Sequence, residues 1–308
     1  MFKMASFPIV NNLWSYIREQ KILKKHKEVS DFWKPIIASY FRKELPIYEV
    51  NSKKKMSNEK IIWQYWGQGI DGELPEVIQA CFASVDKHKG DWTVIRLDDK
   101  MISEYIEFPE YVYQKIDCGI FNKTIFSDLL RLALLKLYGG VWLDATIYMT
   151  GSIPENLASQ DYFMYQRDNE EIHKSFWKNS YAYYWNWDPK FKVNVLNSIF
   201  FAKKNGVVIN TLLDIMLYYW ATQLNIKDYF FFQILYDDLM KGYLQDQKCI
   251  LISDVKPHII QTKINGEYPY STIDVAIADC NLHKMSYFKG LALNNFKSFV
   301  NRSKSFKN

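Results

Sequence analysis

The chain has 308 residues and a formal net charge of +5 at neutral pH, which leaves room for one large α/β domain or two small ones with a sizeable core. It has no apolar run of about 18 residues and no signal-peptide pattern at its start, so we expect neither a membrane-spanning helix nor secretion. The cysteines are scattered singly, which argues against a zinc site or a redox pair and indicates a reduced cytoplasmic environment: Cys81, Cys118, Cys249 and Cys280.

Basic residues concentrate at the two ends of the chain. Residues 1–60 hold 13 Lys and Arg against 6 Asp and Glu, the tail from Lys289 adds 5 basic residues and no acidic ones, and the middle is acidic. This asymmetry predicts an anionic partner at one surface. No nucleic-acid recognition motif is present, so we expect no nucleic acid among the partners.

The first 60 residues form a candidate extension in two parts. Residues 11–27 carry apolar side chains beside five Arg and Lys, a composition typical of a helix that lies on an anionic membrane surface. The alternative is an ordinary solvated helix packed on the domain. Residues 51–60 have the composition of a polar linker.

Residues 61–66, IIWQYW, are β-branched and aromatic and predict the first strand. Gly67, Gly69 and Gly72 then spell G-x-G-x-x-G, the spacing of a dinucleotide-binding loop. That loop needs its third glycine inside the following helix, whereas Pro75 predicts that the helix begins three residues later. A dinucleotide-binding oxidoreductase is therefore the less favoured reading of this loop.

Residues 127–148, SDLLRLALLKLYGGVWLDATIY, are the stretch around which the chain is organised. The first half is apolar on every side, which predicts a buried helix with Ser127 as its cap and Gly139-Gly140 as its stop. A short buried strand follows over residues 141–143, and Asp144 comes directly after it. Ligands of α/β proteins bind beyond the carboxyl ends of strands, so Asp144 is a candidate site residue, with a simple turn residue as the alternative.

Asp128 and Arg131 are the polar side chains at the start of this helix. Their spacing places them on one face of the first turn, where they form either a local ion pair or part of a site. Further along, strands are predicted at residues 93–98, 162–165 and 199–202, and a helix at 206–223. Residues 175–188, rich in Trp and Tyr, either cover an acceptor site or form an irregular core layer.

The stretch 127–148 resembles the core motif of glycosyltransferase family 32, and most closely its bacterial capsular polysaccharide synthesis branch. The resemblance implies that the Asp and Arg of S-D-x-x-R, here Asp128 and Arg131, contact a nucleotide sugar. It also implies that the D-x-D after the strand, which begins at Asp144, holds a metal ion and the diphosphate. Thr146 occupies the second carboxylate position of that motif, a departure from the family pattern.

Other segments share this resemblance. Residues 61–69, IIWQYWGQG, are similar to the family's opening motif. This similarity implies that the aromatic first strand forms a wall of the nucleotide pocket. Three later segments are similar to further family motifs. Asn197-Ser198 begins an N-S-x-x-x-A motif, Asp228-Tyr229 begins a D-Y-F motif, and His283-Lys284 forms a terminal H-K motif. The implied substrate-binding residues are Trp63, Gln64, Tyr65, Trp66, Thr146, Asn197, Ser198, Asp228 and Tyr229, and His283 and Lys284 are implied to act on the metal and the diphosphate. From composition alone, Asp228 is the N-cap of a buried helix.

The resemblance implies a GT-A fold, a mostly parallel sheet between helices, with a catalytic domain over residues 61–288 between the extension 1–60 and the basic tail 289–308. The predicted activity is retaining transfer of galactose or glucose from a UDP-sugar to a lipid-linked oligosaccharide in bacterial capsule synthesis. The predicted cofactor is Mn²⁺ or Mg²⁺, held by Asp144 and His283. The predicted location is cytoplasmic, at the inner face of the cell membrane. The alternative from another class is an inactive protein that binds sugar nucleotides or glycans.

Overall fold

The computed structural model describes residues 8–267 and 272–303. The outermost residues of the predicted extension, 1–7, and of the predicted tail, 304–308, lie outside the described residues. The chain forms two compact units. The first comprises the described residues up to Leu45 with Asn169–Asn194 and Ile226–Gln245, and the second comprises Pro46–Asp168, Val195–Asn225 and the described residues from Asp246 onward.

Among its described residues, the first unit contains three helices, α1 (Pro8–Phe41), α7 (Lys174–Ser180) and α9 (Phe231–Lys241). Helix α1 packs on α9, where the buried Trp33 indole donates to the carbonyl of Phe231 at 2.9 Å and Ser30 donates to Asp238 at 2.9 Å. The predicted basic segment 11–27 is therefore the first half of one long helix, and this half is also packed, since Ile22 and Leu23 are buried and Glu19 accepts from Lys178. This grouping differs from the predicted division, because α1 belongs with segments from the middle of the chain.

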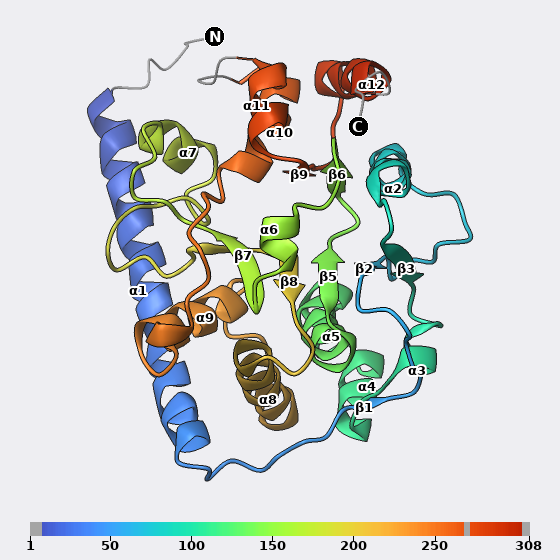
Figure 1. The fold of residues 1–308 in the computed structure, drawn as a ribbon. Coiled ribbons are helices and arrows are strands. Elements are labelled where there is room, and N and C mark those ends of the chain that lie inside the picture. The colour runs from blue at the N-terminus through green and yellow to red at the C-terminus, as the bar shows by residue number, and fades with distance from the viewer. Residues whose placement is uncertain (1–7, 268–271, 304–308) are drawn as a thin grey trace. The chain divides into compact units, whose positions relative to one another are not determined.

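The second unit holds the remaining helices and all the strands of the described chain (Figure 1). Its strands are β1 (Asn51–Ser52), β2 (Ile61–Tyr65), β3 (Thr93–Leu97), β4 (Ile106–Glu107), β5 (Gly140–Leu143), β6 (Ile147–Met149), β7 (Tyr162–Gln166), β8 (Val195–Ala202) and β9 (Leu282–Lys284). Its helices are α2 (Glu76–His88), α3 (Ile102–Tyr105), α4 (Glu110–Asp117), α5 (Lys123–Tyr138), α6 (Glu155–Ala158), α8 (Val207–Thr222), α10 (Ile259–Ile264), α11 (Ile273–Asp279) and α12 (Leu291–Ser303). Two 3₁₀ turns, η1 (Gln245–Gln247) and η2 (Lys256–His258), complete the described elements.

The central sheet has the strand order β3-β2-β5-β8-β7. Strands β3, β2 and β5 pair in parallel, whereas β8 pairs antiparallel with both β5 and β7. All the central strands except β8 therefore run in one direction, which confirms an α/β fold with a mostly parallel sheet. The apolar helix α5 contacts β2, β5 and β8 and packs on α8, so its buried leucines form the core beneath the middle of the sheet.

Each of the predicted strands is present, with boundaries shifted by a few residues. The fingerprint loop does not form, because α2 begins at Glu76 after Pro75, four positions beyond Gly72. The pyrophosphate-binding geometry of a dinucleotide site needs a helix that starts at the loop, and this finding confirms the predicted late start of the helix.

Gly140 allows β5 to approach β2 closely. Its φ is +99°, and a Cβ built there would lie 2.3 Å from the Ile61 carbonyl oxygen, so a larger residue would push apart the strand that carries Asp144. We expect Gly140→Ala to lower the free energy of unfolding by about 1–3 kcal/mol more than Gly69→Ala. Gly69 is the matched control, since its φ is +103° with nothing within 4 Å of the added Cβ. Denaturant titration measures both, and equal losses would show that the close approach is unimportant.

Candidate active site

Helix α5 begins one turn earlier than the sequence predicts. Asn122 is its N-cap, and its side-chain oxygen accepts a hydrogen bond from the backbone N–H of Ile125 at 3.0 Å. The prediction of Ser127 as the cap is wrong, because the Ser127 hydroxyl lies inside the helix and donates to the carbonyl of Thr124. Asp128 consequently lies beyond the first turn, where the helix dipole favours a carboxylate less.

Asp128 and Arg131 form a buried ion pair that extends beyond the helix. Nη1 of Arg131 lies 3.0 Å from Oδ1 of Asp128, and the two side chains are 4% and 10% exposed for Arg131 and Asp128, respectively. The same Nη1 donates to the carbonyl of Asn197 on β8 at 2.8 Å, and the Asn197 amide donates to Asp128 at 2.9 Å. The predicted pair thus exists, but it links α5 to the sheet.

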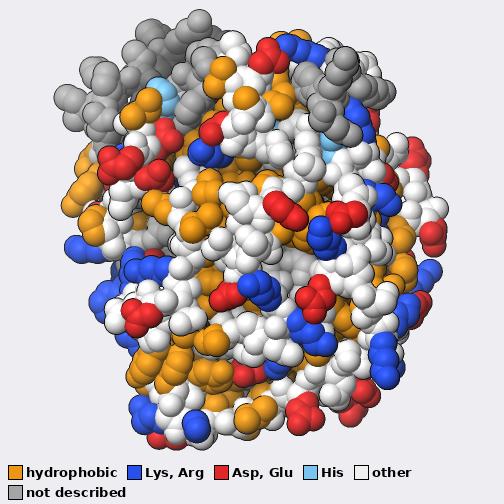
Figure 2. All heavy atoms as spheres, viewed as in Figure 1, with side chains coloured by type: hydrophobic (Ala, Val, Ile, Leu, Met, Phe, Trp, Pro, Cys, Tyr) orange, Lys and Arg blue, Asp and Glu red, His pale blue; other side chains and the backbone are white. Residues whose placement is uncertain are grey.

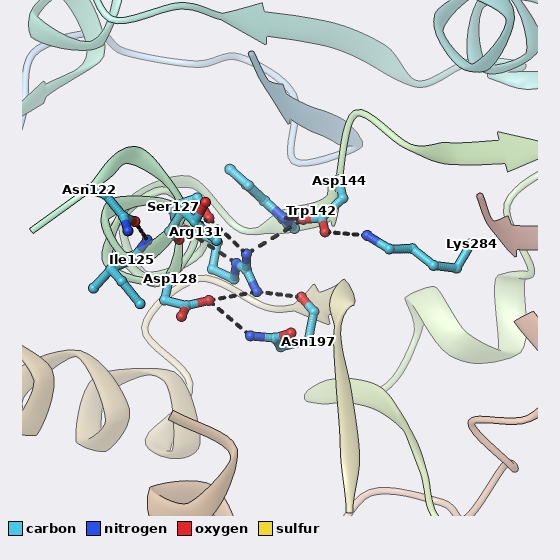
Figure 3. Close-up of polar contacts among 10 residues, drawn as sticks. Asn122, Ile125, Ser127, Asp128, Arg131, Trp142, Asp144, Asn197 and Lys284 are labelled. Atoms are coloured by element: carbon cyan, nitrogen blue, oxygen red, sulfur yellow. Dashed lines mark hydrogen bonds and ion pairs between the residues drawn. The ribbon is translucent and has the colours of Figure 1, made fainter. Parts of the chain in front are cut away.

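Asp144 lies at the carboxyl end of β5, where its carboxylate gathers three donors (Figure 3). Oδ2 accepts from Nζ of Lys284 at 2.7 Å, and Oδ1 accepts from the Trp142 indole at 2.8 Å and from Nη2 of Arg131 at 3.5 Å. The Asp144 backbone N–H donates to the carbonyl of Ser198 at 2.9 Å. We call Asp128, Arg131, Trp142, Asp144, Asn197 and Lys284 the Asp144 cluster.

The environment shifts the pKa values of the two carboxylates in the cluster, Asp128 and Asp144, in opposite directions. Burial opposes the ionisation of Asp144, but the charges of Lys284 and Arg131 outweigh burial and lower its pKa to about 2. Burial raises the pKa of Asp128 to about 6, against the opposing charge of Arg131. Asp144 is therefore ionised at neutral pH. The pKa of Asp128, in contrast, lies close to neutral pH.

Lys284 arrives from a distant part of the sequence through the pairing of β6 with β9. Ile147 is opposite Lys284 in this antiparallel ladder, and the Met285 N–H donates to the Thr146 carbonyl at 2.9 Å. Thr146 lies in the turn between β5 and β6, partly exposed beside Asp144. The structure thus brings Asp128, Arg131, Asp144, Thr146, Asn197, Ser198 and Lys284 together from α5, the ends of β5 and β8, and β9.

His283 does not join this cluster. Successive strand residues point to opposite faces, so the residue before Lys284 is turned away from Asp144. Its ring is fully buried, with Nε2 at 2.9 Å from the Thr150 hydroxyl, and burial lowers its pKa to about 3. The predicted pairing of Asp144 with His283 around a metal ion is contradicted by this placement.

The donor set at Asp144 does not fit a divalent cation as the side chains lie. Both carboxylate oxygens already accept from cations or from an indole, and position 146 offers a hydroxyl in place of a carboxylate. Among residues 8–267 and 272–303, no three His, Cys, Asp or Glu side chains are grouped closely enough to hold a metal ion. The requirement for Mn²⁺ or Mg²⁺ stays a prediction.

The rings of the first strand have different environments. Trp63 is fully buried and donates to the Gly139 carbonyl at 3.0 Å, so the prediction that it stacks on a base is wrong. Gln64 is also fully buried and accepts from Arg96, and the Tyr65 hydroxyl donates to Asp99. Trp66 is half-buried and packs against a small core cluster of Ile78, Phe82 and Ala145, the residue after Asp144. Of these four predicted residues, Trp66 is the one that is not buried.

Asp228 and Tyr229 belong to the first unit. The Asp228 carboxylate accepts from the Phe230 N–H at 2.8 Å, but α9 begins at Phe231 with Phe230 at the N-cap, so the predicted cap is wrong by two residues. Tyr229 is 61% exposed. In the aromatic segment of this unit, Trp177 and Trp185 are buried against each other, which favours the core-layer interpretation for those two rings.

Trp142 is a member of the cluster that the sequence analysis missed. Strand alternation places Trp142 and Asp144 on the same side of the chain, and this spacing of two could have indicated that the indole reaches the carboxylate. Its ring also lies under Arg131, whose guanidinium carbon is 5.2 Å from the ring centroid. The hydrogen bond from Arg131 to the Asn197 carbonyl could not have been predicted in this way, because every residue type has a backbone carbonyl.

Comparison with known proteins gives partial and whole-chain matches. The chain is 30% identical over 108 residues to O-glycosyltransferase braB of Annulohypoxylon truncatum, covering 32% of this chain and 26% of that protein. It is 27% identical over 111 residues to O-glycosyltransferase PaGT of Phomopsis amygdali, covering 33% of this chain and 27% of that protein. The chain thus spans about a quarter of the length of these curated relatives. A solved structure, the PaToxG glycosyltransferase, aligns with a TM-score of 0.36 and 16% identity over 85% of this chain and 94% of that one.

The family model described as capsular polysaccharide synthesis protein matches residues 13–302. This match covers α1 from Leu13 onward and the whole Asp144 cluster, and it confirms the predicted resemblance to capsular polysaccharide synthesis proteins, while the assignment to glycosyltransferase family 32 stays a prediction. The chain therefore belongs to the capsular polysaccharide synthesis protein family.

Proposed function

We propose that the chain is a hexosyltransferase that moves galactose or glucose from a UDP-sugar to a saccharide acceptor, on a GT-A-type fold. The observation that carries the proposal is the Asp144 cluster, which gathers two cations and two carboxylates at the carboxyl end of β5. Ligands of α/β proteins bind at this edge of the sheet. Family membership and the partial similarity to two O-glycosyltransferases support the reaction class.

The charges of the cluster suit the transfer of a sugar. When the bond between the anomeric carbon and the diphosphate breaks, positive charge develops on the sugar ring and negative charge on the leaving group. Groups fixed where that charge develops contribute most of the acceleration. In this proposal Lys284 and Arg131 face the diphosphate, and Asp128 and Asn197 hold sugar hydroxyls. The acceptor oxygen forms the new bond with retention as the bond to the diphosphate breaks, and the acceptor proton passes to the leaving diphosphate. Trp66 forms the wall for the base.

A donor panel tests the proposal. The purified chain is mixed with UDP-glucose, UDP-galactose and other nucleotide sugars plus an oligosaccharide acceptor, and products are read by mass spectrometry. We expect one UDP-hexose to add a hexose mass to the acceptor and to release UDP. Tight donor binding with neither product would contradict the enzyme and favour the inactive binding protein, while binding of NADH would favour an oxidoreductase.

We further propose a lipid-linked acceptor in capsule synthesis and docking of α1 on the anionic inner face of the membrane. No helix of the described chain is long and apolar enough to cross a bilayer. Arg18, Lys21 and Lys24 are exposed without an ion-pair partner among the described residues, beside the exposed Leu13 and Trp14. Figure 2 shows Lys and Arg side chains gathered along the edge where Figure 1 draws the middle of α1.

Vesicle binding should depend on these unpaired cations. Each basic residue near an anionic surface contributes about 1 kcal/mol, so replacing Arg18, Lys21 and Lys24 with Gln should lower partitioning onto phosphatidylserine vesicles about 100-fold. The matched control replaces Lys27, Lys34 and Arg42, which carry the same charge but are paired with Asp31 or Glu44. We expect the control to change sedimentation only a few-fold, since the carboxylates of Asp31 and Glu44 already offset most of these three charges. Equal losses in the two triple variants would contradict docking through α1.

A further inference from the structure

We propose that Lys284, held in place by Asp144, takes the position of the divalent cation, so that transfer proceeds without a metal ion. This inference rests on the proposed function, because it specifies how the leaving diphosphate is neutralised. It makes Lys284 a diphosphate-binding residue and Asp144 a positioning residue. The predicted metal requirement is thereby replaced by a requirement for one lysine.

The first step is the occupancy of the Asp144 carboxylate. Lys284 lies on Oδ2 at 2.7 Å, while Trp142 and Arg131 lie on Oδ1 at 2.8 and 3.5 Å. A metal ion at this carboxylate would have to displace Lys284 and would then sit beside its ammonium group. Divalent cations prefer oxygen ligands, and protein sites for Mg²⁺ usually offer one or two free carboxylates. Asp144 offers none, since its oxygens already hold the two cations.

The second step is the absence of the other ligands that a metal would need. Thr146 stands where a second carboxylate would complete the motif, and its carbonyl is used by the Met285 N–H. The neighbouring imidazole of His283 is buried on Thr150. The alternation of β9 therefore presents an ammonium group to Asp144 and turns the metal-ligating ring away. One residue shift in the β6–β9 register would exchange the two side chains.

The third step is the capacity of Lys284 to bind an anion. Its side chain is 23% exposed, and within the described part of the chain Nζ has one partner, Asp144. An ammonium group has three N–H donors, so two are available to phosphate oxygens. The β6–β9 ladder fixes the lysine backbone, and Asp144 fixes its head group, which removes much of the freedom that a surface lysine would lose on binding. A compact cation preorganised in this way acts on phosphate as a point charge.

The metal requirement is tested by transfer in excess EDTA and in Mn²⁺, with the donor identified by the panel. We expect rates that agree within about twofold, because no step depends on the ion. Transfer that EDTA abolishes and Mn²⁺ restores would overturn the inference while leaving the proposed function intact. Absence of transfer with every donor under both conditions would instead count against the proposed function.

The role of Lys284 is tested by Lys284→Gln, which should lower kcat/KM about 100-fold, with partial recovery in Lys284→Arg. Lys289→Gln is the matched control, since Lys289 is exposed on the same segment and loses the same charge. Titration calorimetry with UDP in EDTA gives a readout independent of turnover. We expect wild type and Lys289→Gln to bind UDP alike and Lys284→Gln to bind at least about tenfold more weakly. UDP binding that needs Mn²⁺, or that is equal in all three proteins, would overturn the proposal.

Discussion

Replacing Arg131 with Lys should lower kcat/KM for the sugar donor by about 100- to 1,000-fold while the protein remains folded. The guanidinium reaches Asp128 at 3.0 Å, the Asn197 carbonyl at 2.8 Å and Asp144 at 3.5 Å from one planar group. A lysine has one nitrogen and can satisfy only part of this set. Because Arg131→Lys preserves the positive charge, a fall in kcat/KM would show that the cluster depends on the geometry of the guanidinium. Steady-state kinetics measures it, with thermal unfolding as the check on folding.

Arg96→Lys is the matched control for this experiment. The Arg96 guanidinium also donates hydrogen bonds to two side chains, Asp86 and Gln64, and the Arg96 side chain is 21% exposed. It does not belong to the Asp144 cluster. We therefore expect Arg96→Lys to lower thermal stability with little change in kcat/KM per folded molecule. Full activity in Arg131→Lys would show that Asp128 and Arg131 form a structural pair and nothing more.

The sequence was informative where local pattern decides structure. The run of leucines in α5 predicted a buried helix, the glycine pair predicted its end, and the short apolar strand placed Asp144 at the edge of the sheet. Each of these features depends on neighbours within a few residues. The N-terminus of α5 was misplaced because Asn122 and Ser127 are both good caps, and residue type alone does not choose between them.

Features that depend on distant pairing were less predictable from residues alone. The contact between Lys284 and Asp144 joins residues 140 positions apart and depends on the β6–β9 register. The same register decides that His283 faces the core, which the motif H-K cannot reveal. Likewise strand alternation places Trp63 and Trp66 on opposite faces, but only the packed sheet shows that the first is buried and the second half-exposed. The membership of α1 in a unit with α7 and α9 also depends on packing between remote segments.

Replacing Asp144 with Asn should lower kcat/KM by about 1,000-fold or more, the largest effect we expect at a single position. The amide keeps the size of the side chain and still accepts from the Trp142 indole. It loses the charge that holds Lys284 at 2.7 Å and attracts Arg131 at 3.5 Å. Both cations would then lack their common anchor near the diphosphate. Asp161→Asn is the control, because Asp161 forms an exposed ion pair with Lys203 outside the cluster.

A double-mutant cycle distinguishes the two roles that Asp144 could have. If Asp144 acts by positioning Lys284, then Lys284→Gln should add little to the loss already caused by Asp144→Asn, because both changes remove the same interaction. Residues in direct contact show such non-additivity, whereas independent contributions add. Fully additive losses, together with recovery of Asp144→Asn by high Mn²⁺, would identify Asp144 as a ligand of a cation that acts separately from Lys284. A strongly sub-additive cycle that Mn²⁺ does not alter is the result expected from the placement of Lys284 on the Asp144 carboxylate.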